Sequence, residues 1–349
     1  MKQLKFVGLL FMIFALALAG CGGSQDDGGA TGDEGTETEG TEETEGTDAG
    51  GDDAAAEEDS PDFLSMLTGG TSGTYYPLGG EIAAIITDTT GVQTDAVSSN
   101  ASADNVMAVH NDEAELAFVQ TDVMANAAEG INAFEGEPIE DVLAVGSLYP
   151  ETIQIVTSAD SGINSVEDLA GKTVSVGAPG SGTFINAEQI LEVHGLTMDD
   201  IDAQNLDFGE STGGIQDGNI DAAFITAGTP TGAVEGLTAT TDISIVPVAP
   251  EKVEELIAKY PYYAQDVIPA GTYGLEEEVE TVAVLAMLVA KDSLSEDLVY
   301  DITKALYENA GSMSHAKAEF ITLDTALDGI GIDLHPGAER YFSEEGLIE

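Results

Sequence analysis

The fold of this chain is best recognised in Thr68-Gly-Gly-Thr-Ser-Gly-Thr-Tyr-Tyr-Pro-Leu-Gly-Gly80. An apolar run over 63–67 precedes this stretch, and Pro77 suits the first turn of a helix, where the backbone nitrogen has no intrahelical partner. The pattern therefore predicts a strand, a glycine-rich loop and a helix over 78–87. Unpaired N–H groups and the positive end of the helix dipole would face the loop and favour an anion there.

The residue types in this loop narrow the choice of anion. The loop lacks the Lys-Ser/Thr pair of a P-loop and the third glycine of a dinucleotide fingerprint, so a carboxylate is favoured over a polyphosphate. Its candidate ligand-binding residues are Gly70, Thr71, Ser72, Gly73 and Tyr75. Tyr75 suits the wall of a pocket, with packing in the core as its alternative. An ordinary tight turn is the alternative for the loop as a whole.

A second glycine-rich loop repeats this arrangement later in the chain. A short predicted strand precedes Gly177-Ala-Pro-Gly-Ser-Gly-Thr183, and a predicted helix over 184–194 follows it. The candidate ligand-binding residues of this loop are Ser181, Gly182 and Thr183. Ligands of open α/β sheets bind beyond the carboxyl ends of the strands. If the two loops lie on facing lobes, they would therefore close on one ligand from both sides.

The rest of the chain alternates between strand and helix patterns, which predicts an α/β fold with a mostly parallel sheet. Further candidate ligand residues are Asn100, Gln120 and Phe224, each at a predicted strand end. Asn100 and Gln120 would serve equally well as helix caps, and Phe224 as a core residue. The chain would cross between two lobes at 147–150, and an irregular passage is expected over 261–273. The other predicted strands are 92–97, 115–119, 143–146, 153–156, 173–176, 221–224, 243–248 and 281–290, and the other helices 105–109, 213–218, 251–260, 298–307 and a short one near the C-terminus.

The N-terminus has the features of an exported lipoprotein. Two lysines precede an apolar run over 6–19, which is too short to span a bilayer and is typical of a secretory signal. The segment Leu18-Ala-Gly-Cys21 resembles the bacterial lipobox, in which the cysteine is lipidated. We therefore expect a signal peptide over 1–21, lipidation of Cys21 and a location on the outer face of the cell membrane. Cys21 is the only cysteine, so the mature chain would contain no internal disulfide.

An acidic segment of low complexity follows over 22–61. It has too little apolar surface to fold, so we expect a disordered tether. The whole chain carries a net charge of −56, and residues 62–349 carry about −43, with 50 acidic and seven basic residues. Nucleic acid is excluded as a partner, because phosphate contacts require lysine and arginine. We interpret the charge as a salt-adapted surface rather than a metal-binding one, since high salt screens the repulsion.

Motifs for catalysis and metal binding are weak in this sequence. The segment Gly209-Glu-Ser-Thr-Gly213 matches the Gly-x-Ser-x-Gly elbow of hydrolases, and His315 and His335 lie downstream of it. The pentapeptide is common by chance, and Ser211 more simply caps the helix that follows. The four histidines have no metal-ligand spacing. We therefore expect a binding protein that has no cofactor, no metal and no enzymatic activity.

An ordered set of motifs connects these observations. Together the motifs resemble the TAXI-type solute-binding subunits of TRAP transporters over residues 67 to about 346. Each motif is weak alone, whereas the set in this order is specific. In addition to the first loop, the motifs are Leu116-Ala-Phe-Val-Gln120, Ser147-Leu-Tyr-Pro-Glu151, Asp168-Leu-Ala-Gly-Lys172, Gly180-Ser-Gly-Thr183, Gly218-Asn-Ile-Asp-Ala-Ala-Phe224, Tyr260-Pro-Tyr-Tyr263, Ile268-Pro-Ala-Gly-Thr-Tyr273 and His335-Pro-Gly-Ala338.

The resemblance implies a type II periplasmic-binding-protein fold, in which two α/β lobes joined by a hinge close on an extracellular solute. Lobe 1 would comprise 62–150 and 276–349, and lobe 2 would comprise 151–275. The implied partners are a membrane permease driven by an ion gradient and a small carboxylate such as glutamate, glutamine or 2-oxoglutarate. A monomer is expected. A subunit of an ABC importer and a signalling lipoprotein receptor are the alternatives.

The scarcity of cations bears on how a carboxylate would be held. The folded part contains one arginine, Arg340, which lies near the C-terminus and away from the loop motifs. Other TRAP receptors hold a carboxylate with an arginine, so backbone N–H groups and loop hydroxyls would take that role here. Lys172 is expected at the end of a strand opposite the ligand, which favours a structural role.

The charge of residues 62–349 predicts that salt stabilises the folded domain. We expect the melting temperature to rise steeply between dilute buffer and molar sodium chloride, where the Debye length falls to about 3 Å. Differential scanning fluorimetry over that range measures the effect. A melting temperature that stays constant would contradict a salt-adapted surface.

Lipidation of Cys21 makes a separate prediction. The variant Cys21→Ser is expected to leave the membrane fraction while its affinity for ligand stays unchanged, because the tether separates the anchor from the folded domain. Cell fractionation and a binding measurement on the released protein test both parts. Membrane retention of the variant equal to that of the wild type would rule out the anchor.

Overall fold

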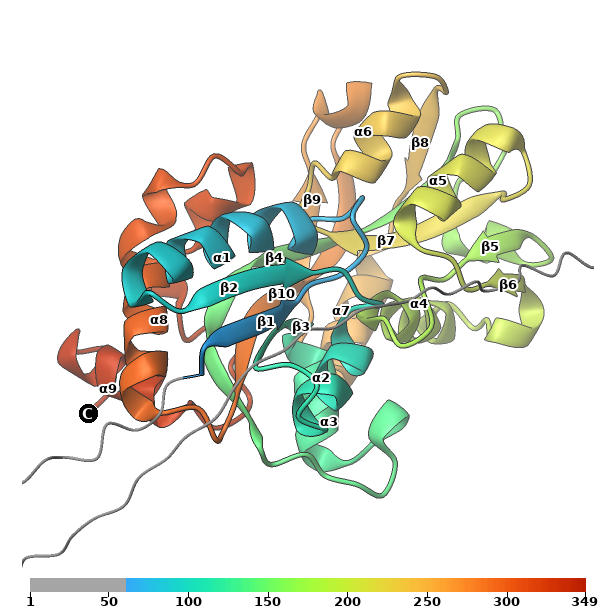
Figure 1. Cartoon of the computed structure of the whole chain (residues 1–349). Coiled ribbons are helices and arrows are strands. Elements are labelled where there is room, and N and C mark those ends of the chain that lie inside the picture. The colour runs from blue at the N-terminus through green and yellow to red at the C-terminus, as the bar shows by residue number, and fades with distance from the viewer. Residues whose placement is uncertain (1–60) are drawn as a thin grey trace, which may run out of the picture. The chain divides into compact units, whose positions relative to one another are not determined.

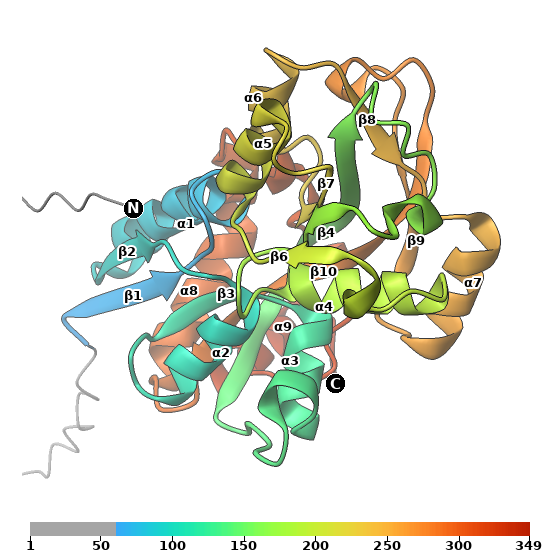
Figure 2. The same ribbon diagram turned by 90° about the vertical axis from the view of Figure 1, so that its right-hand side faces the viewer.

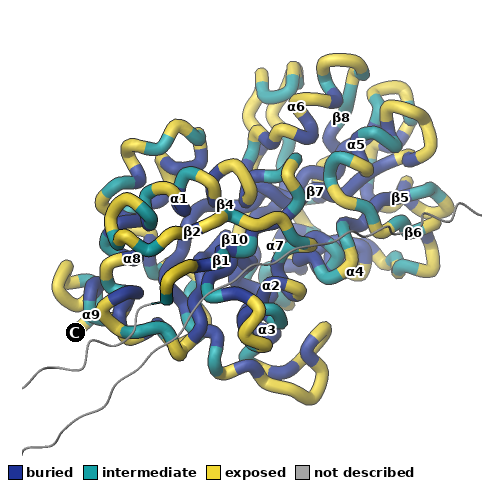
Figure 3. The backbone as a smooth tube through the Cα atoms, in the orientation of Figure 1, coloured by how far each residue is buried: buried dark blue, intermediate teal, exposed yellow. Residues whose placement is uncertain are grey.

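Two long strands lie at the centre of the computed structural model, which describes residues 61–349 (Figure 1). These strands, β4 (Val142–Ser158) and β10 (Val279–Lys291), pair antiparallel within a sheet of ten strands. Almost every residue of both strands is buried (Figure 3), which explains their nearly continuous apolar sequences. The α/β fold is confirmed, but the prediction of a mostly parallel sheet was wrong, because five of the nine strand pairings are antiparallel. The predictions for the signal peptide, Cys21 and the tether up to residue 60 lie outside the described residues.

The first half of the fold packs beside β10, in the strand order β2-β1-β3-β10. The three strands β1 to β3 are parallel to one another, as the alternation of strands and helices predicts. Helix α1 buries Leu78, Ile82 and Ile86 against them, at helical spacing. The elements of the first half are β1 (Phe63–Leu67), α1 (Tyr75–Thr90), β2 (Gln93–Val97), α2 (Ser102–His110), β3 (Leu116–Gln120), α3 (Thr121–Glu129), α8 (Glu296–Asn309) and α9 (Pro336–Glu344).

The second half packs beside β4, in the strand order β4-β7-β5-β6, while β8 pairs with β4 and β9 with β10. No helix in residues 61–349 is long and apolar enough to cross a membrane. The elements of the second half are β5 (Thr173–Ser175), α4 (Gly182–Val193), β6 (Asp202–Gln204), α5 (Phe208–Asp217), β7 (Ala222–Ala227), α6 (Gly232–Thr238), β8 (Ile243–Val246), α7 (Pro250–Lys259) and β9 (Ala264–Ile268).

Each half has a main hydrophobic core, and the two cores share the central strands, while Ile185 of α4 packs among residues of the first half. On β4, Tyr149 packs in the core of the first half and Ile153 in that of the second. On β10, the change of core falls between Val284 and Ala286. Both strands therefore pass from one core to the other at the same level of the sheet. In Figure 1, α1 and α8 of the first half lie at the left, and α5 and α6 of the second half lie at the upper right.

The prediction of two strands separated at 147–150 was wrong, because β4 runs through this segment without a break. Pro150 has no N–H group, and proline is tolerated inside a sheet where the ladder is irregular. Pro150 pairs with Leu285, and the register between β4 and β10 shifts between Leu285 and Met287. The irregular ladder thus lies beside the proline and at the crossing between the two cores.

Other element boundaries also differ from the predictions. Helix α1 begins three residues earlier than predicted, at Tyr75. Strand β7 continues beyond Phe224 to Ala227, because the small and apolar residues there are still buried. Strand β9 occupies part of the passage that we predicted to be irregular. The short final helix is confirmed as α9.

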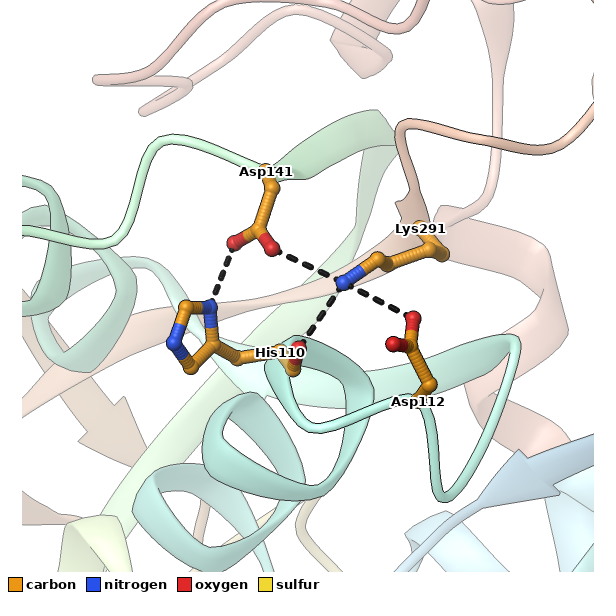
Figure 4. A network of polar contacts seen from close by, with 4 residues as sticks. All are labelled: His110, Asp112, Asp141 and Lys291. Atoms are coloured by element: carbon orange, nitrogen blue, oxygen red, sulfur yellow. Dashed lines mark hydrogen bonds and ion pairs between the residues drawn. The ribbon is translucent and has the colours of Figure 1, made fainter.

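An ion-pair network ties the end of β10 to α2 and to the start of β4 (Figure 4). Lys291 Nζ lies 2.8 Å from Asp141 Oδ2 and 3.1 Å from Asp112 Oδ1, and it donates to the His110 carbonyl oxygen at 2.8 Å. His110 Nδ1 lies 2.7 Å from Asp141 Oδ1. Burial alone would raise the pKa of Asp141, but hydrogen bonds with Lys291 and His110 hold that pKa below its ordinary value.

We expect Lys291→Met to lower the free energy of unfolding by about 1.5–3 kcal/mol, the usual effect of losing hydrogen bonds to a charged group. Lys304→Met is the control, since it removes the same charge and Lys304 forms no ion pair in residues 61–349. Because the pKa of Asp141 is lowered by folding, its contribution is complete above about pH 4 and is lost on further acidification. Equal destabilisation by both variants at high salt would contradict a specific role for the network.

Candidate functional site

A cavity of about 440 Å³ lies where the two halves meet. It is lined by the loops after β1, β2 and β5, by the ends of β3 and β7, and by the start of α5. These are the carboxyl ends of strands, the position at which open α/β sheets bind ligands. A volume of this size suits a small organic molecule. The cavity is therefore the candidate ligand-binding site.

Four helices begin at the cavity: α1, α2, α4 and α5 each contribute first-turn or capping residues to its lining. The first N–H groups of a helix lack intrahelical acceptors, and the helix dipole is positive at this end. No lysine or arginine lines the cavity, and Lys172 is not among its residues. Helix starts are thus the source of positive potential at this site.

The first loop brings Gly70, Thr71, Gly73 and Tyr75 to the cavity, as a ligand site in this loop would require. Gly73 donates its N–H to the Gly70 carbonyl oxygen at 3.1 Å, which closes a tight turn before α1. The Tyr75 ring packs on Phe118 with the ring centroids 5.0 Å apart. Tyr75 is therefore both part of the cavity wall and part of the hydrophobic core. Tyr75 is 7% exposed.

The second loop brings Ser181, Gly182 and Thr183 to the cavity from the other half. Ser181 is the N-cap of α4, and its hydroxyl accepts a hydrogen bond from the Phe184 N–H at 3.3 Å. A Cβ at Gly182 would lie 1.8 Å from Gln120 Oε1, so only glycine allows Gln120 to approach α4 this closely. Glycine is needed here for close contact between the halves.

Asn100 and Gln120 also line the cavity. Asn100 is exposed and donates its side-chain N–H to Asp104 Oδ2 at 2.7 Å, which ties it to the first turn of α2. Gln120 precedes α3 but makes no capping hydrogen bond through its side chain. Its Oε1 atom is buried and has no hydrogen-bond partner in residues 61–349. Gln120 thus has free capacity to bind a ligand, whereas Asn100 has its amide already engaged.

Two predicted site residues lie away from the cavity lining. Ser72 accepts a hydrogen bond from the Ala233 N–H at 3.0 Å through its carbonyl oxygen, and so joins the first loop to α6. Phe224 is fully buried in the core of the second half. Phe224 was expected at a strand end, but β7 continues, and Thr226 and Ala227 reach the cavity instead.

The Gly-x-Ser-x-Gly segment does not form a nucleophile elbow. Residues 209–213 lie inside α5, and Asp207 is the residue that caps this helix, not Ser211 as predicted. The Ser211 hydroxyl is fully buried, donates to the Asp207 carbonyl oxygen at 2.6 Å and lies 2.7 Å from Ser175 Oγ. The hydrogen bonds of the Ser211 hydroxyl therefore have a structural role. In the described part of the chain, no group of three or more His, Cys, Asp or Glu side chains is arranged to hold a metal ion.

Glu151 lines the cavity from β4 and is only 2% exposed, and it was not among the predicted site residues. Tyr75 donates its hydroxyl hydrogen to Glu151 Oε2 at 2.7 Å. Burial raises the pKa of Glu151 to about 8, against the opposing effect of hydrogen bonds with Tyr75 and Gln120, and the nearby Asp122 raises it further. The available signal was that Glu151 is the one charged residue in a long buried strand, since acids are rarely buried without a partner.

Hydrogen bonds join the two halves around the cavity. Ala103 donates its N–H to the Gly180 carbonyl oxygen at 2.9 Å. Asn186 on α4 donates to Asp122 Oδ2 on α3 at 3.0 Å and to the Tyr263 hydroxyl at 2.9 Å. Figure 2 shows α3 and α4 as neighbours. Burial raises the pKa of Asp122 to about 6.

Comparison with known proteins finds solved structures that are similar to this chain over most of its length. MatC from Rhodopseudomonas palustris, solved with bound malate, is 14% identical, with 82% of this chain and 99% of that chain covered and a TM-score of 0.51. A protein from Bordetella bronchiseptica RB50 is 19% identical, with 82% and 81% covered and a TM-score of 0.51. The alkanesulfonate-binding protein SsuA from Xanthomonas axonopodis pv. citri, bound to MOPS, is 16% identical, with 81% and 84% covered and a TM-score of 0.49.

These similarities show that the fold is of the periplasmic-binding-protein type. A match to a protein family extends over residues 66–346, which includes both halves and every loop that lines the cavity. The match therefore covers the whole folded part except for its first and last few residues. The chain belongs to the NMT1-like family.

Proposed function

We propose that this protein is the extracellular solute-binding receptor of a membrane transporter and that it binds a small carboxylate in the cavity. The observation that carries this proposal is the convergence of four helix starts on one cavity between two halves. Helix starts bind carboxylates through N–H groups and through the dipole, without needing an arginine. MatC, which shares the fold, was solved with the dicarboxylate malate, and this ligand class supports the proposal.

The contacts of the carboxylate are proposed as follows. The backbone N–H groups of Gly70 and Thr71 and the hydroxyls of Thr71, Ser181 and Thr183 bind its oxygens. Each charge-assisted hydrogen bond contributes about 1.5–3 kcal/mol, so a few of them hold a carboxylate after the costs of association. Gly182 keeps the start of α4 close to the first half, and Gln120 and Tyr75 complete the wall.

Binding is proposed to close two lobes, with 62–150 and 276–349 as lobe 1 and 151–275 as lobe 2. The crossing of β4 and β10 between the two cores supplies the hinge, since it is the segment that both cores share. Closure forms the hydrogen bonds between Ala103 and Gly180 and between Ala233 and Ser72. These bonds join segments next to the cavity, so the movement that closes the lobes also encloses the ligand.

The partner of the receptor is proposed to be a TRAP-type permease driven by an ion gradient, because of the ordered motifs that resemble TAXI-type subunits. An ABC importer is the alternative. A TRAP permease gene next to the gene for this protein supports the first proposal, and genes for an ATPase and its permease support the second. Lipidation of Cys21 is proposed to hold the receptor at the membrane where either permease would lie.

We expect Thr183→Val to weaken the binding of a small carboxylate ten- to a hundredfold, because it removes one charge-assisted hydrogen bond at the start of α4. The ligand is first found by a thermal-shift screen at high salt over amino acids, keto acids, dicarboxylates and sugars. Thr303→Val is the matched control, since Thr303 is a buried threonine of α8 that bonds only within its helix.

Isothermal titration calorimetry with the ligand from the screen measures both variants. A hit confined to sugars would overturn the carboxylate proposal. Equal affinities for Thr183→Val and wild type would remove Thr183 from the site.

A further inference from the structure

One side of the cavity is rich in hydrogen-bond acceptors that the binding of a carboxylate does not use. We call Glu151, Gln120 and Thr226 the acceptor cluster; they come from β4, β3 and β7 and are 2%, 3% and 4% exposed. Gln120 Oε1 and Thr226 Oγ1 are buried and have no hydrogen-bond partner in the described residues. Both atoms therefore have unused capacity in a site from which water is largely excluded.

The acceptor cluster also holds a carboxyl group with no cation beside it. Glu151 accepts a hydrogen bond from the Tyr75 hydroxyl at 2.7 Å and has a second hydrogen bond with the side chain of Gln120, and no lysine or arginine lines the cavity. An ionised carboxylate without a counter-charge is costly to bury. Asp122, also buried, adds a second negative group nearby. This side of the cavity therefore favours a positively charged group that donates hydrogen bonds.

We infer that the ligand is an amino acid and that Glu151 selects its ammonium group over the keto or hydroxyl group of a related acid. An ammonium group has three N–H donors, and Glu151, Gln120 and Thr226 offer an acceptor for each. Helix starts bind the carboxylate, while the neighbouring acceptor cluster binds the ammonium group, which an amino acid carries on the carbon next to its carboxylate. The inference rests on the proposed carboxylate-binding function and adds the identity of the second charged group.

The inference predicts whether protons are released or taken up when the ligand binds, and this can be measured. Because burial raises the pKa of Glu151 to about 8, the free carboxyl is mostly protonated at pH 7. An ammonium group binds the ionised form of Glu151, so binding at pH 7 releases close to one proton. The affinity for the ligand is therefore expected to increase by a factor of tens between pH 6 and pH 8. The other ionisable groups around Glu151 are Tyr75, Tyr149 and Asp122. Burial raises the pKa of both tyrosines well above the ordinary value, so they stay neutral over this range. Burial raises the pKa of Asp122 to about 6, so Asp122 is mostly ionised above pH 7, and the change in affinity between pH 7 and pH 8 reports on Glu151.

A protonated Glu151 that donates a hydrogen bond to the ligand predicts the opposite dependence of affinity on pH. If protonated Glu151 donated a hydrogen bond to a ligand carboxylate or carbonyl group, binding would take up protons or leave them unchanged. Affinity would then fall, or stay constant, as the pH rises from 6 to 8. Calorimetric titrations at pH 7 in two buffers of different ionisation enthalpy count the protons directly.

The experiment uses matched pairs of ligands that differ only at the α-position: L-glutamate with 2-oxoglutarate, L-alanine with pyruvate, and L-phenylalanine with phenylpyruvate. We expect the amino member of the binding pair to bind at least tenfold more tightly than its keto partner. Equal or tighter binding of the keto acid, or uptake of protons, overturns the inference while leaving the carboxylate proposal intact. If no carboxylate binds, the carboxylate proposal fails and the inference falls with it.

Substitutions assign the effect to Glu151. In Glu151→Gln, the affinity for the amino acid is expected to fall ten- to a hundredfold and to lose its dependence on pH between 6 and 8, while the keto acid binds no more weakly than before. Glu113→Gln is the control, because Glu113 is an exposed acid outside the cavity. Selection unchanged in Glu151→Gln would overturn the assignment.

Tyr75→Phe keeps the test valid if Glu151→Gln does not fold. Loss of the Tyr75 hydroxyl removes a hydrogen bond that stabilises ionised Glu151. The pKa of Glu151 then rises further, and the pH at which amino-acid affinity reaches half of its maximum moves upward. A profile in Tyr75→Phe that coincides with that of the wild type would contradict the role of Glu151.

Discussion

The antiparallel pairing of β4 with β10 is the interaction on which the rest of the fold depends. Each strand contributes to both hydrophobic cores, so neither half could keep its present core without them. The ladder becomes irregular beside Pro150, at the same level at which the side chains change from one core to the other. We propose that this two-strand connection, with its irregular pairing, is the hinge about which the two halves move.

The position of this crossing also determines the chemistry of the cavity. Glu151 follows Pro150 directly, and so its carboxyl group is held where β4 passes between the halves and water is scarce. The low dielectric of such a place makes an unpaired carboxylate expensive and a paired one strong. Helix starts from both halves supply positive potential in the same cavity. The site therefore combines groups of opposite character, which suits a small zwitterion better than a neutral solute.

The parts that could be predicted from the sequence are those with local causes. Loop glycines and apolar periodicity are read within a few residues, and they correctly predicted a loop before α1, a loop before α4 and most strands and helices, although both helices begin earlier than predicted. Errors arose where distant residues decide the outcome. Strand β4 continues through 147–150 because β10 pairs with it, and Phe224 lies in the core because β7 extends further. Glu151 was missed because its importance comes from burial against Tyr75, a contact between residues far apart in the chain.

The central claim is that two rigid halves close on a ligand at the crossing of β4 and β10. Cys21 is the only cysteine, so a Cys21→Ser background leaves no other site for a spin label. Labels can then be attached to Asp88→Cys in α1 and Glu235→Cys in α6, both of which are exposed positions. Double electron–electron resonance then measures the distance between the halves with and without L-glutamate. The account predicts a longer and broader distance distribution in the free protein and a shorter, narrower one in the presence of the ligand. An identical distribution at a ligand concentration that saturates the thermal shift would contradict closure.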